Sequence, residues 1–398
     1  MEREKILFIF GAGASAEGGA PLMGNFLENA KKILFDKKIV LKNKDDFKRV
    51  FGAIDTLRNG QIEEKLNKKI DWDNIESVFS VFEEIQSIED FPISSEDRKS
   101  FSRSLIRLIL ETLEQSIIFP PSVSTGLQYH QPPYPYGLFA TLLDKINKTT
   151  AYEISLITFN YDFSLDYALE RLHLQYGYFL DEDHPAIPLL KPHGSLNWVK
   201  CNQCGRISPI PFAEYGQSYF DSYKIEKHLT NELGKEPQTG KIMHSEIRNL
   251  LDKHKCPYCC SKAESSPKPI FWNEEPVIIP PIKSKNYEKL QIIHDKVKEE
   301  IGSADYIYII GYSFPESDNN YIRKYIDENA KKYKRMILIN PDDDKSLENQ
   351  FEDHNYRREI RNLRFGGSII TIAEDLGLDF TEIKIMADNL GLSIGLPI

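Results

Sequence analysis

The stretch that decides the fold is Lys5 to Asn25, KILFIFGAGASAEGGAPLMGN. Its apolar run, Ile6 to Phe10, is too short for a helix and rich in strand-forming residues, and it leads directly into Gly11-Ala12-Gly13. This order predicts a first strand, a glycine turn and the start of a helix. In the pattern G-x-G-x-x-G/A, with Ala16 last, such a turn lets a pyrophosphate approach the N–H groups at the helix start. A glycine turn that binds no ligand is the alternative.

The composition indicates a globular protein with a sizeable core. Of 398 residues, 41% are hydrophobic and 28% charged, which leaves room for two or three domains or for one large domain with insertions. The net charge of -10 does not favour a broad nucleic-acid surface. No apolar run has the length of a membrane span or of a signal peptide, and the five cysteines form two tight clusters, so we expect a cytoplasmic protein.

A helical insertion, residues 28–135, is expected after the first strand–turn–helix unit, either covering the nucleotide cleft or making an interface. Amphipathic patterns predict helices over Phe26–Phe35, from Ile75 through Ile85 and over Ser95–Ile118. The last helix has a broad apolar stripe, formed by Leu105, Leu108 and Ile109 beside Ile117 and Ile118. A stripe of this size exceeds what one small sheet face covers, so it predicts a homo-oligomer.

Polar residues follow two further predicted strands. Ile154–Phe159 ends in Asn160-Tyr161-Asp162, and Ile187–Leu190 leads to Lys191-Pro192-His193-Gly194. Open α/β sheets bind ligands at the carboxyl ends of their strands, so Asn160, Asp162 and His193 are candidate site residues. Helix capping is the alternative role for Asn160 and Asp162, and a structural role is the alternative for His193.

The later part of the chain continues the alternation. Asp305–Ile310 is a predicted strand that ends in Gly311-Tyr312-Ser313, and Met336–Ile339 is another that ends in Asn340-Pro341. The pattern as a whole predicts a Rossmann-like, doubly wound parallel sheet over residues 1–345. In the remaining segment, 346–398, Ser368–Ile372 is strand-like and Phe380–Leu392 helical; we expect this segment to pack on the sheet or at an interface.

Two CxxC pairs predict a structural zinc site in a module of about residues 199–269. The pairs are Cys201 with Cys204 and Cys256 with Cys259, and each pair can present two thiolates to one tetrahedral ion. The separation of the pairs is long, so an insertion such as Phe212–Leu251 must loop out. Cys260 could replace Cys259 as the fourth ligand, and four free or buried thiols are the alternative.

Taken in order, these motifs resemble those of the sirtuin superfamily, over about half of the chain. The resemblance implies NAD+ binding and a Zn2+ module with the four cysteines above. It implies a first NAD loop at Gly11, Ala12, Gly13, Ser15 and Pro21, an Asn-x-Asp motif at Thr158, Asn160 and Asp162, a catalytic His-Gly at His193, and adenosine-side motifs at Gly311, Ser313 and Asn340.

Two departures from the sirtuin pattern touch the acyl-lysine side. Leu22-Met23-Gly24 follows Pro21 where deacylases have Asp-Phe-Arg, and Val277–Pro281 lacks their Phe-Gly-Glu triplet. The pattern resembles the sirtuin-like NAD+ hydrolases of bacterial anti-phage defence, some of which work in large oligomers or with a HerA-type ATPase. It predicts an NAD+ glycohydrolase with catalytic residues Asn160, His193 and Asp162. The alternatives are an NAD-dependent protein deacylase and a non-catalytic sensor of NAD or ADP-ribose.

Overall fold

The computed structural model describes residues 3–41, 43–60, 62–86, 95–124, 127–180, 185–209, 256, 258–259, 277–279, 290–315, 318, 322–341 and 358–392. The expected insertion Phe212–Leu251 and the spare thiol of Cys260 lie outside these residues.

The central element is a parallel sheet of seven strands in the order β11-β10-β9-β1-β4-β6-β5. Residues Ile6 to Phe10 of β1 pair with Ile154 to Thr158 of β4 on one side and with Tyr306 to Ile310 of β9 on the other. The strands are β1 (Lys5–Phe10), β4 (Glu153–Thr158), β5 (Tyr176–Gly177), β6 (Ile187–Leu190), β9 (Tyr306–Ile310), β10 (Arg335–Ile339) and β11 (Arg358–Arg361). The predicted fold class is confirmed.

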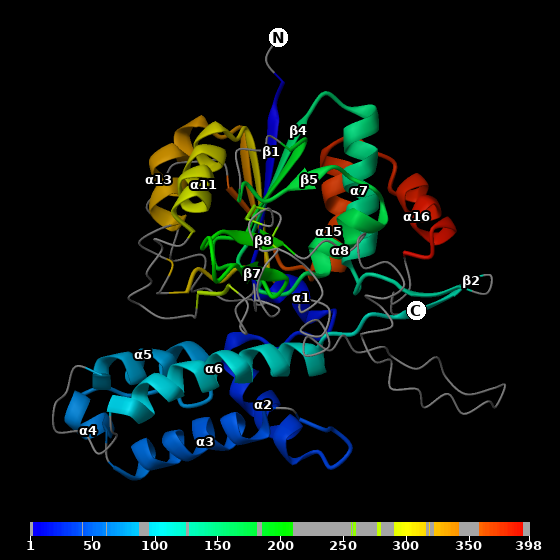
Figure 1. Ribbon diagram of the computed structural model, residues 1–398. Helices are drawn as coiled ribbons and strands as arrows, with labels where there is room; N and C mark the ends of the chain where they lie inside the picture. Colours follow the sequence, from blue (N-terminus) through cyan, green and yellow to red (C-terminus); the bar gives the residue numbers. More distant parts are fainter. Residues whose placement is uncertain are drawn as a thin grey trace.

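Helices cover both faces of this sheet (Figure 1). One face has α7 (Tyr136–Thr149), α8 (Ser164–Arg171), α15 (Phe365–Asp375) and α16 (Phe380–Asn389), and the other has α11 (Gln291–Ser303) and α13 (Lys324–Asn329). Strand β1 lies in the middle, where Phe8 and Phe10 each pack edge-on against Phe139 of α7, at 5.1 and 5.2 Å between ring centroids. The sheet core therefore depends on the apolar run that opens the chain.

A second layer of helices lies below the carboxyl edge of the sheet in Figure 1. It contains α2 (Phe26–Phe35), α3 (Lys44–Asn59), α4 (Ile62–Leu66), α5 (Ile75–Gln86) and α6 (Ser95–Ser116), with the short helices α1 (Ala12–Ala16) and η1 (Met23–Asn25) leading into it. These helices enclose a core of their own, in which α6 packs on α3 and α2. A hairpin that the helical reading did not predict, β2 (Pro121–Ser124) and β3 (Leu127–His130), follows α6.

The apolar stripe of α6 is buried inside the chain. Leu105, Leu108, Ile109 and Ile117 all belong to the second core, and only Ile118 is exposed, at 37%. This stripe therefore needs no partner subunit, contrary to the expectation from the sequence, because α2, α3 and α5 supply the apolar surface that covers it.

The strand expected over Ser368–Ile372 is also wrong, because these residues lie in helix α15. The β-branched residues suggested a strand, but Phe365, Ile369, Ile372 and Ala373 recur at helical spacing and are all buried. This face packs toward α7, so tertiary burial outweighs the local strand preference. The strand of this region is instead β11, at the edge of the sheet.

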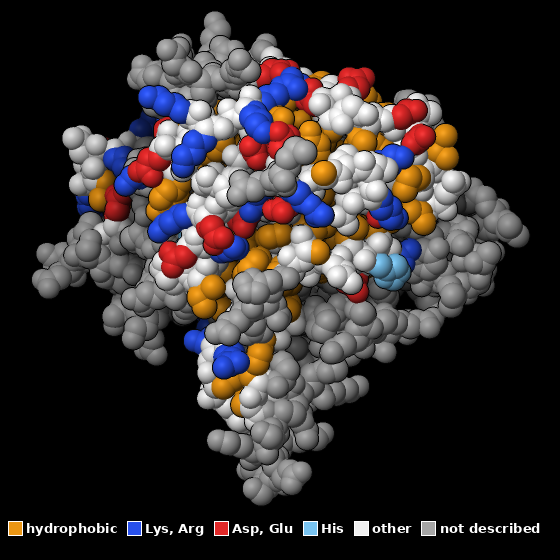
Figure 2. Space-filling model, turned by 90° about the horizontal axis from the view of Figure 1, so that it is seen from above, with side chains coloured by type: hydrophobic (Ala, Val, Ile, Leu, Met, Phe, Trp, Pro, Cys, Tyr) orange, Lys and Arg blue, Asp and Glu red, His pale blue; other side chains and the backbone are white. Residues whose placement is uncertain are grey.

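Among the described residues on the face seen from above in Figure 2, acidic and basic side chains are intermixed with apolar ones, without a patch of one sign. In the part of the chain that the structure describes, no helix is long and apolar enough to cross a membrane.

Candidate active site

Residues that directly follow five parallel strands form the candidate site. Gly13, Asn160, His193, Gly311 and Asn340 lie just beyond β1, β4, β6, β9 and β10, and all five line one cavity of about 750 Å³. Leu22, Met23, Gly24 and Asn74, from the segments that lead into the second helical layer, line it too. Because β1 is where the strand order reverses direction, the cavity lies at the switch point of the sheet, where α/β proteins bind ligands.

The glycines of the first turn are required by packing. Gly11 has φ -111°, which any residue adopts, but a Cβ there would lie 2.6 Å from the Gly311 carbonyl oxygen. Gly13 packs against the same residue and donates its N–H to Gly311 O at 2.8 Å, and Ala14 donates to Gly11 O. The backbone N–H groups of Gly13 and Ala14 are thus already hydrogen-bonded within the chain. Ala12 and Gly13 form part of the cavity wall.

Ser15 does not line the cavity; its hydroxyl holds three other side chains together. It donates to Asp162 Oδ2 at 2.8 Å, accepts from Asn160 Nδ2 at 2.9 Å and bonds the Tyr136 hydroxyl at 2.8 Å. One donor and two lone pairs are all that a hydroxyl has, so Ser15 is saturated. Burial, and then the charge of Asp162, raise the pKa of Tyr136 well above its usual value, which keeps this phenol a neutral donor.

Asn160 is held with its amide nitrogen turned into the protein. Nδ2 donates to Gly11 O at 2.9 Å and to Ser15 Oγ, and its backbone N–H donates to Thr158 Oγ1 at 3.2 Å. Both amide hydrogens are therefore used, and the group that Asn160 offers the cavity is its carbonyl oxygen Oδ1, a hydrogen-bond acceptor.

Five predicted site residues stay outside the cavity lining: Gly11, Ser15, Pro21, Thr158 and Asp162. Asp162 accepts the Ser164 N–H at 2.9 Å as well as the Ser15 hydroxyl, Thr158 is buried under Asn160, and Pro21 is buried beside the turn. Ala12, Ser313 and Asn340, which are also predicted site residues, do line the cavity.

His193 is fixed by contacts that sequence reasoning missed. Its Nε2 lies 3.1 Å from Asp318 Oδ1, and Tyr312 donates its hydroxyl to Asp318 Oδ2 at 2.8 Å. Asp318 follows the turn after β9 without a motif of its own, and Tyr312 is the middle residue of Gly311-Tyr312-Ser313. The ring of Phe159 packs edge-on to His193 with 5.0 Å between centroids.

A buried ion pair lies behind the site. Lys191, two residues before His193 on the chain, donates to Asp166 Oδ2 at 3.0 Å and to Asp162 O at 2.6 Å, and the side chains of Lys191 and Asp166 are fully buried. Tyr178 donates to Asp166 Oδ1 at 2.5 Å. Burial, and then the charge of Asp166, raise the pKa of Tyr178 well above its usual value. These contacts tie the end of β6 to α8.

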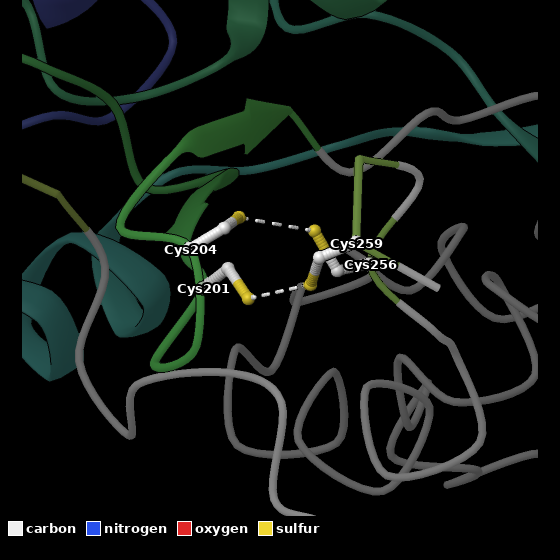
Figure 3. Close-up of side chains that lie close together, drawn as sticks. All are labelled: Cys201, Cys204, Cys256 and Cys259. Atoms are coloured by element: carbon white, nitrogen blue, oxygen red, sulfur yellow. Dashed lines mark hydrogen bonds between the residues drawn. The ribbon is translucent and has the colours of Figure 1, made fainter. Parts of the chain in front are cut away.

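The four predicted cysteine ligands come together at one point (Figure 3). Cys201 and Cys204 flank the turn of a hairpin, β7 (Trp198–Lys200) with β8 (Ile207–Pro209), and Cys256 and Cys259 approach from a separate segment. Sulfur atoms of Cys201 and Cys259, and of Cys204 and Cys256, lie 3.7 Å apart. Zinc with Zn–S bonds of about 2.3 Å has sulfurs about 3.8 Å apart, so the cluster fits a tetrahedral zinc ion.

The thiols of this cluster differ in acidity. Burial raises the pKa of Cys201, but backbone N–H donors of Cys204 and Gln203 outweigh it and lower that pKa to about 7. Burial and the neighbouring sulfurs raise the pKa of Cys259 to about 12. A metal would have to displace the proton of Cys259, because the thiolate is the ligand.

No protein-family model matches the chain, and no curated protein matches it. Among solved structures it is similar to one of the Sir2 enzymes, with 14% identity, a TM-score of 0.40, and 97% of this chain and 94% of that chain covered. It is similar to a mutant Sir2 homologue in complex with ADP ribose, with 15% identity, a TM-score of 0.40 and 95% of each chain covered. It is similar to Sir2Tm bound to a propionylated peptide, with 13% identity, a TM-score of 0.37 and 95% of each chain covered.

Proposed function

We propose that this chain is an NAD+ glycohydrolase, which cleaves the bond between nicotinamide and ribose with water as the acceptor. The supporting observation is that Asn160 and His193 line one cavity at the switch point of the sheet, together with turn residues of β1, β9 and β10. A cavity of about 750 Å³ is within the size range of small-molecule and cofactor sites.

In this proposal the dinucleotide lies across the ends of the strands. The adenosine half lies near Gly311, Ser313 and Asn340, the pyrophosphate passes Ala12 and Gly13, and the nicotinamide ribose lies between Asn160 and His193. All of these residues face the same cavity. Ser15, Thr158 and Asp162 then have an indirect role: their hydrogen bonds hold Asn160 and the first turn in place, and they do not contact the ligand.

The reaction is NAD+ plus water to nicotinamide, ADP-ribose and one proton. The electron pair of the C1′–N bond leaves with nicotinamide, and water forms the new C1′–O bond through an oxocarbenium-like state. Asn160 Oδ1 orients the water or a ribose hydroxyl, and His193 accepts a proton from the ribose hydroxyl, which becomes more acidic as the cation develops. Zinc, held by four cysteines with no open position, would be structural.

A protein deacylase is the second candidate. Where the resemblance places the acyl-peptide strand, the described residues are Val277 to Ile279. Val277 donates its backbone N–H to Trp198 O and accepts the Ser195 N–H at its carbonyl. Ile279 donates its N–H to His193 O and accepts the Tyr161 hydroxyl at its carbonyl. The backbone groups of both residues are therefore used within the chain. This supports water over an acylated peptide as the acceptor. A non-catalytic sensor of NAD or ADP-ribose remains the third candidate.

The biological role is proposed from the sequence resemblance alone. This role is NAD+ depletion in bacterial anti-phage defence, in the cytoplasm, with a HerA-type ATPase as the class of partner. The activity is restrained until assembly or infection, because unrestrained NAD+ loss harms the host.

The test is incubation of the purified chain with NAD+ alone, followed by measurement of released nicotinamide. We expect release without peptide, and a loss of about a hundredfold or more in His193→Ala and in Asn160→Ala. Asp162→Asn should lose less, since Asn can still accept the Ser164 N–H. The control is His173→Asn, which removes an exposed imidazole at a positive φ that Asn tolerates and should keep the wild-type rate.

Other outcomes select the alternatives. Release that requires an acylated peptide indicates the deacylase. Binding of NAD+ without release of nicotinamide, both by the chain alone and by the chain mixed with its partner, indicates the sensor. A wild-type rate in His193→Ala shows that the site has been misplaced.

A further inference from the structure

We infer that Asp318 is a positioning residue that holds His193 in one tautomer, with the proton on Nε2 and with Nδ1 as the nitrogen that accepts a proton during turnover. The inference rests on the proposed function for the reaction that it serves, but the His193–Asp318 contact itself is independent of that function.

The contact joins two side chains that lie 125 residues apart in sequence and are both buried. His193 Nε2 lies 3.1 Å from Asp318 Oδ1, and the two residues are 4% and 1% exposed. A carboxylate only accepts hydrogen bonds, so the hydrogen of this contact belongs to Nε2. In the neutral ring the other nitrogen, Nδ1, is then the base.

The carboxylate is itself fixed by a second donor. Tyr312 donates its hydroxyl to the other oxygen, Asp318 Oδ2, at 2.8 Å. The Tyr312 ring stacks on Phe159, with 4.6 Å between centroids and 15° between planes, and Phe159 packs edge-on to His193. Asp318 thus meets a hydroxyl on one oxygen and an imidazole on the other, and the same aromatic ring contacts both donor residues.

The main chain of His193 is equally restrained. Its carbonyl accepts the Ile279 N–H at 2.8 Å, and Gly194 follows at φ +81°, where a Cβ would lie 2.0 Å from Val277 O. With backbone, ring face and Nε2 all held, the imidazole has one orientation toward the cavity that it lines.

The chemical consequence follows from charge. When a ribose hydroxyl gives its proton to Nδ1, the ring becomes an imidazolium with a hydrogen on each nitrogen. The Nε2 hydrogen stays on the ring, and the buried carboxylate of Asp318 remains ionised opposite the new positive charge, which it stabilises. Without this carboxylate the ring can place its hydrogen on Nδ1, where it cannot accept the proton.

The decisive variant is Asp318→Asn, which keeps the size of the side chain but removes its charge. We expect kcat for nicotinamide release to fall about a hundredfold with KM changed by less than about threefold, because only the transition state carries the extra charge. Asp318→Glu, which retains a carboxylate, should keep more activity. Tyr312→Phe is the matched control, because it removes the hydrogen bond from the Tyr312 hydroxyl to the same carboxylate and should cost less activity.

The tautomer is read by nitrogen NMR of the protein labelled with 15N in histidine, with the His193 signals identified by their absence in His193→Ala. We expect the Nε2–H form in the wild type and its loss in Asp318→Asn. Zinc content and circular dichroism check that each variant is folded. If Asp318→Asn does not fold, Asp318→Glu is used in its place.

An Asp318→Asn variant with the wild-type rate overturns the inference. So does one that loses activity while His193 keeps the Nε2–H form, because Asp318 would then act on the fold alone. A wild-type chain that releases no nicotinamide but shows the Nε2–H form contradicts the proposed function and leaves the pairing in place.

Discussion

Ser15 shows how a residue in a ligand-binding motif can serve the site without touching the ligand. Its position in the glycine turn predicted a contact to NAD+, yet its hydroxyl already bonds Asn160, Asp162 and Tyr136. The three partners come from the end of β4 and from α7, so Ser15 links the first turn to both. Because Ser15 accepts a hydrogen bond from Asn160 Nδ2, it helps to leave Oδ1 as the atom that Asn160 presents to the cavity.

The Lys191–Asp166 pair gives a prediction at the same scale. Lys191→Met leaves Asp166 as a buried carboxylate without its cation, so we expect the free energy of unfolding to fall by about 3–5 kcal/mol. The double variant Lys191→Met/Asp166→Leu removes both charges and should lose less. Urea unfolding measures both.

The control for this experiment is Lys32→Met. It breaks the exposed pair of Lys32 with Glu28, and should change stability by less than about 1 kcal/mol. Equal losses in the buried and exposed variants, or a double variant worse than Lys191→Met, would contradict the prediction.

At the scale of elements, the cavity depends on the close approach of two turns. The turn after β1 and the turn after β9 meet backbone to backbone, at Gly13 and Gly311, and Gly311 has φ +58° with Ala14 N only 2.3 Å from where its Cβ would be. A side chain at Gly311 would push the turns apart. The glycines of both motifs therefore shape the wall of the cavity.

The zinc module gives the second prediction. Cys259→Ser should lose the metal, because its sulfur is one of the four that converge, whereas Cys260→Ser should retain about one zinc per chain. Metal analysis of the purified variants distinguishes them. The opposite pattern would make Cys260 the ligand, and a stable wild type without zinc would remove the site.

Zinc affinity should also fall as the pH is lowered. Metal binding requires thiolates, and the pKa of Cys201 is lowered to about 7 while burial raises the pKa of Cys256, so protons compete with the metal throughout the neutral range. Titration of the zinc-loaded chain with a colorimetric chelator between pH 8 and 6 should show easier release at the acid end. Release that does not depend on pH would contradict this.

At the scale of the molecule, the site lies between two hydrophobic cores. The sheet core holds β1, and the second core holds the helical layer together with Tyr161, Phe163 and Tyr167, which follow Asn160 on the chain. Cys201 and Cys256 belong to the second core as well. Loss of zinc should therefore disturb packing beside the cavity, although none of Cys201, Cys204, Cys256 and Cys259 lines it.

A homo-oligomer remains a prediction, now on other grounds than the stripe of α6. Ile370 of α15 and Ile385 and Leu390 at α16 are exposed, at 39%, 53% and 46%, and association through them would remove apolar surface from water. Light scattering should give a mass above the 46.0 kDa of one chain, and Ile385→Asp should lower it. Lys384→Asp, one residue away and exposed, is the control; a monomer at micromolar concentration contradicts the prediction.

The sequence by itself was sufficient for five strands of the parallel sheet, β1, β4, β6, β9 and β10, for the residues that follow them and for the two cysteine pairs. Short apolar runs followed by Gly11, Asn160, His193, Gly311 and Asn340 are local signals, and parallel strands bring their carboxyl ends to one edge whatever else the chain does. The spacing within each CxxC pair is likewise local, so the convergence of the sulfurs could be expected.

Only the tertiary structure decided what surrounds those residues. Asp318 reaches His193 across the sheet, Ser15 is saturated by partners from β4 and α7, and α6 buries its stripe under α2, α3 and α5. The isoleucines of α15 form a helix because one face of that helix meets α7. Each of these depends on contacts between segments far apart in the chain, and such contacts have no local pattern, because free energy is gained only when the distant surfaces come together.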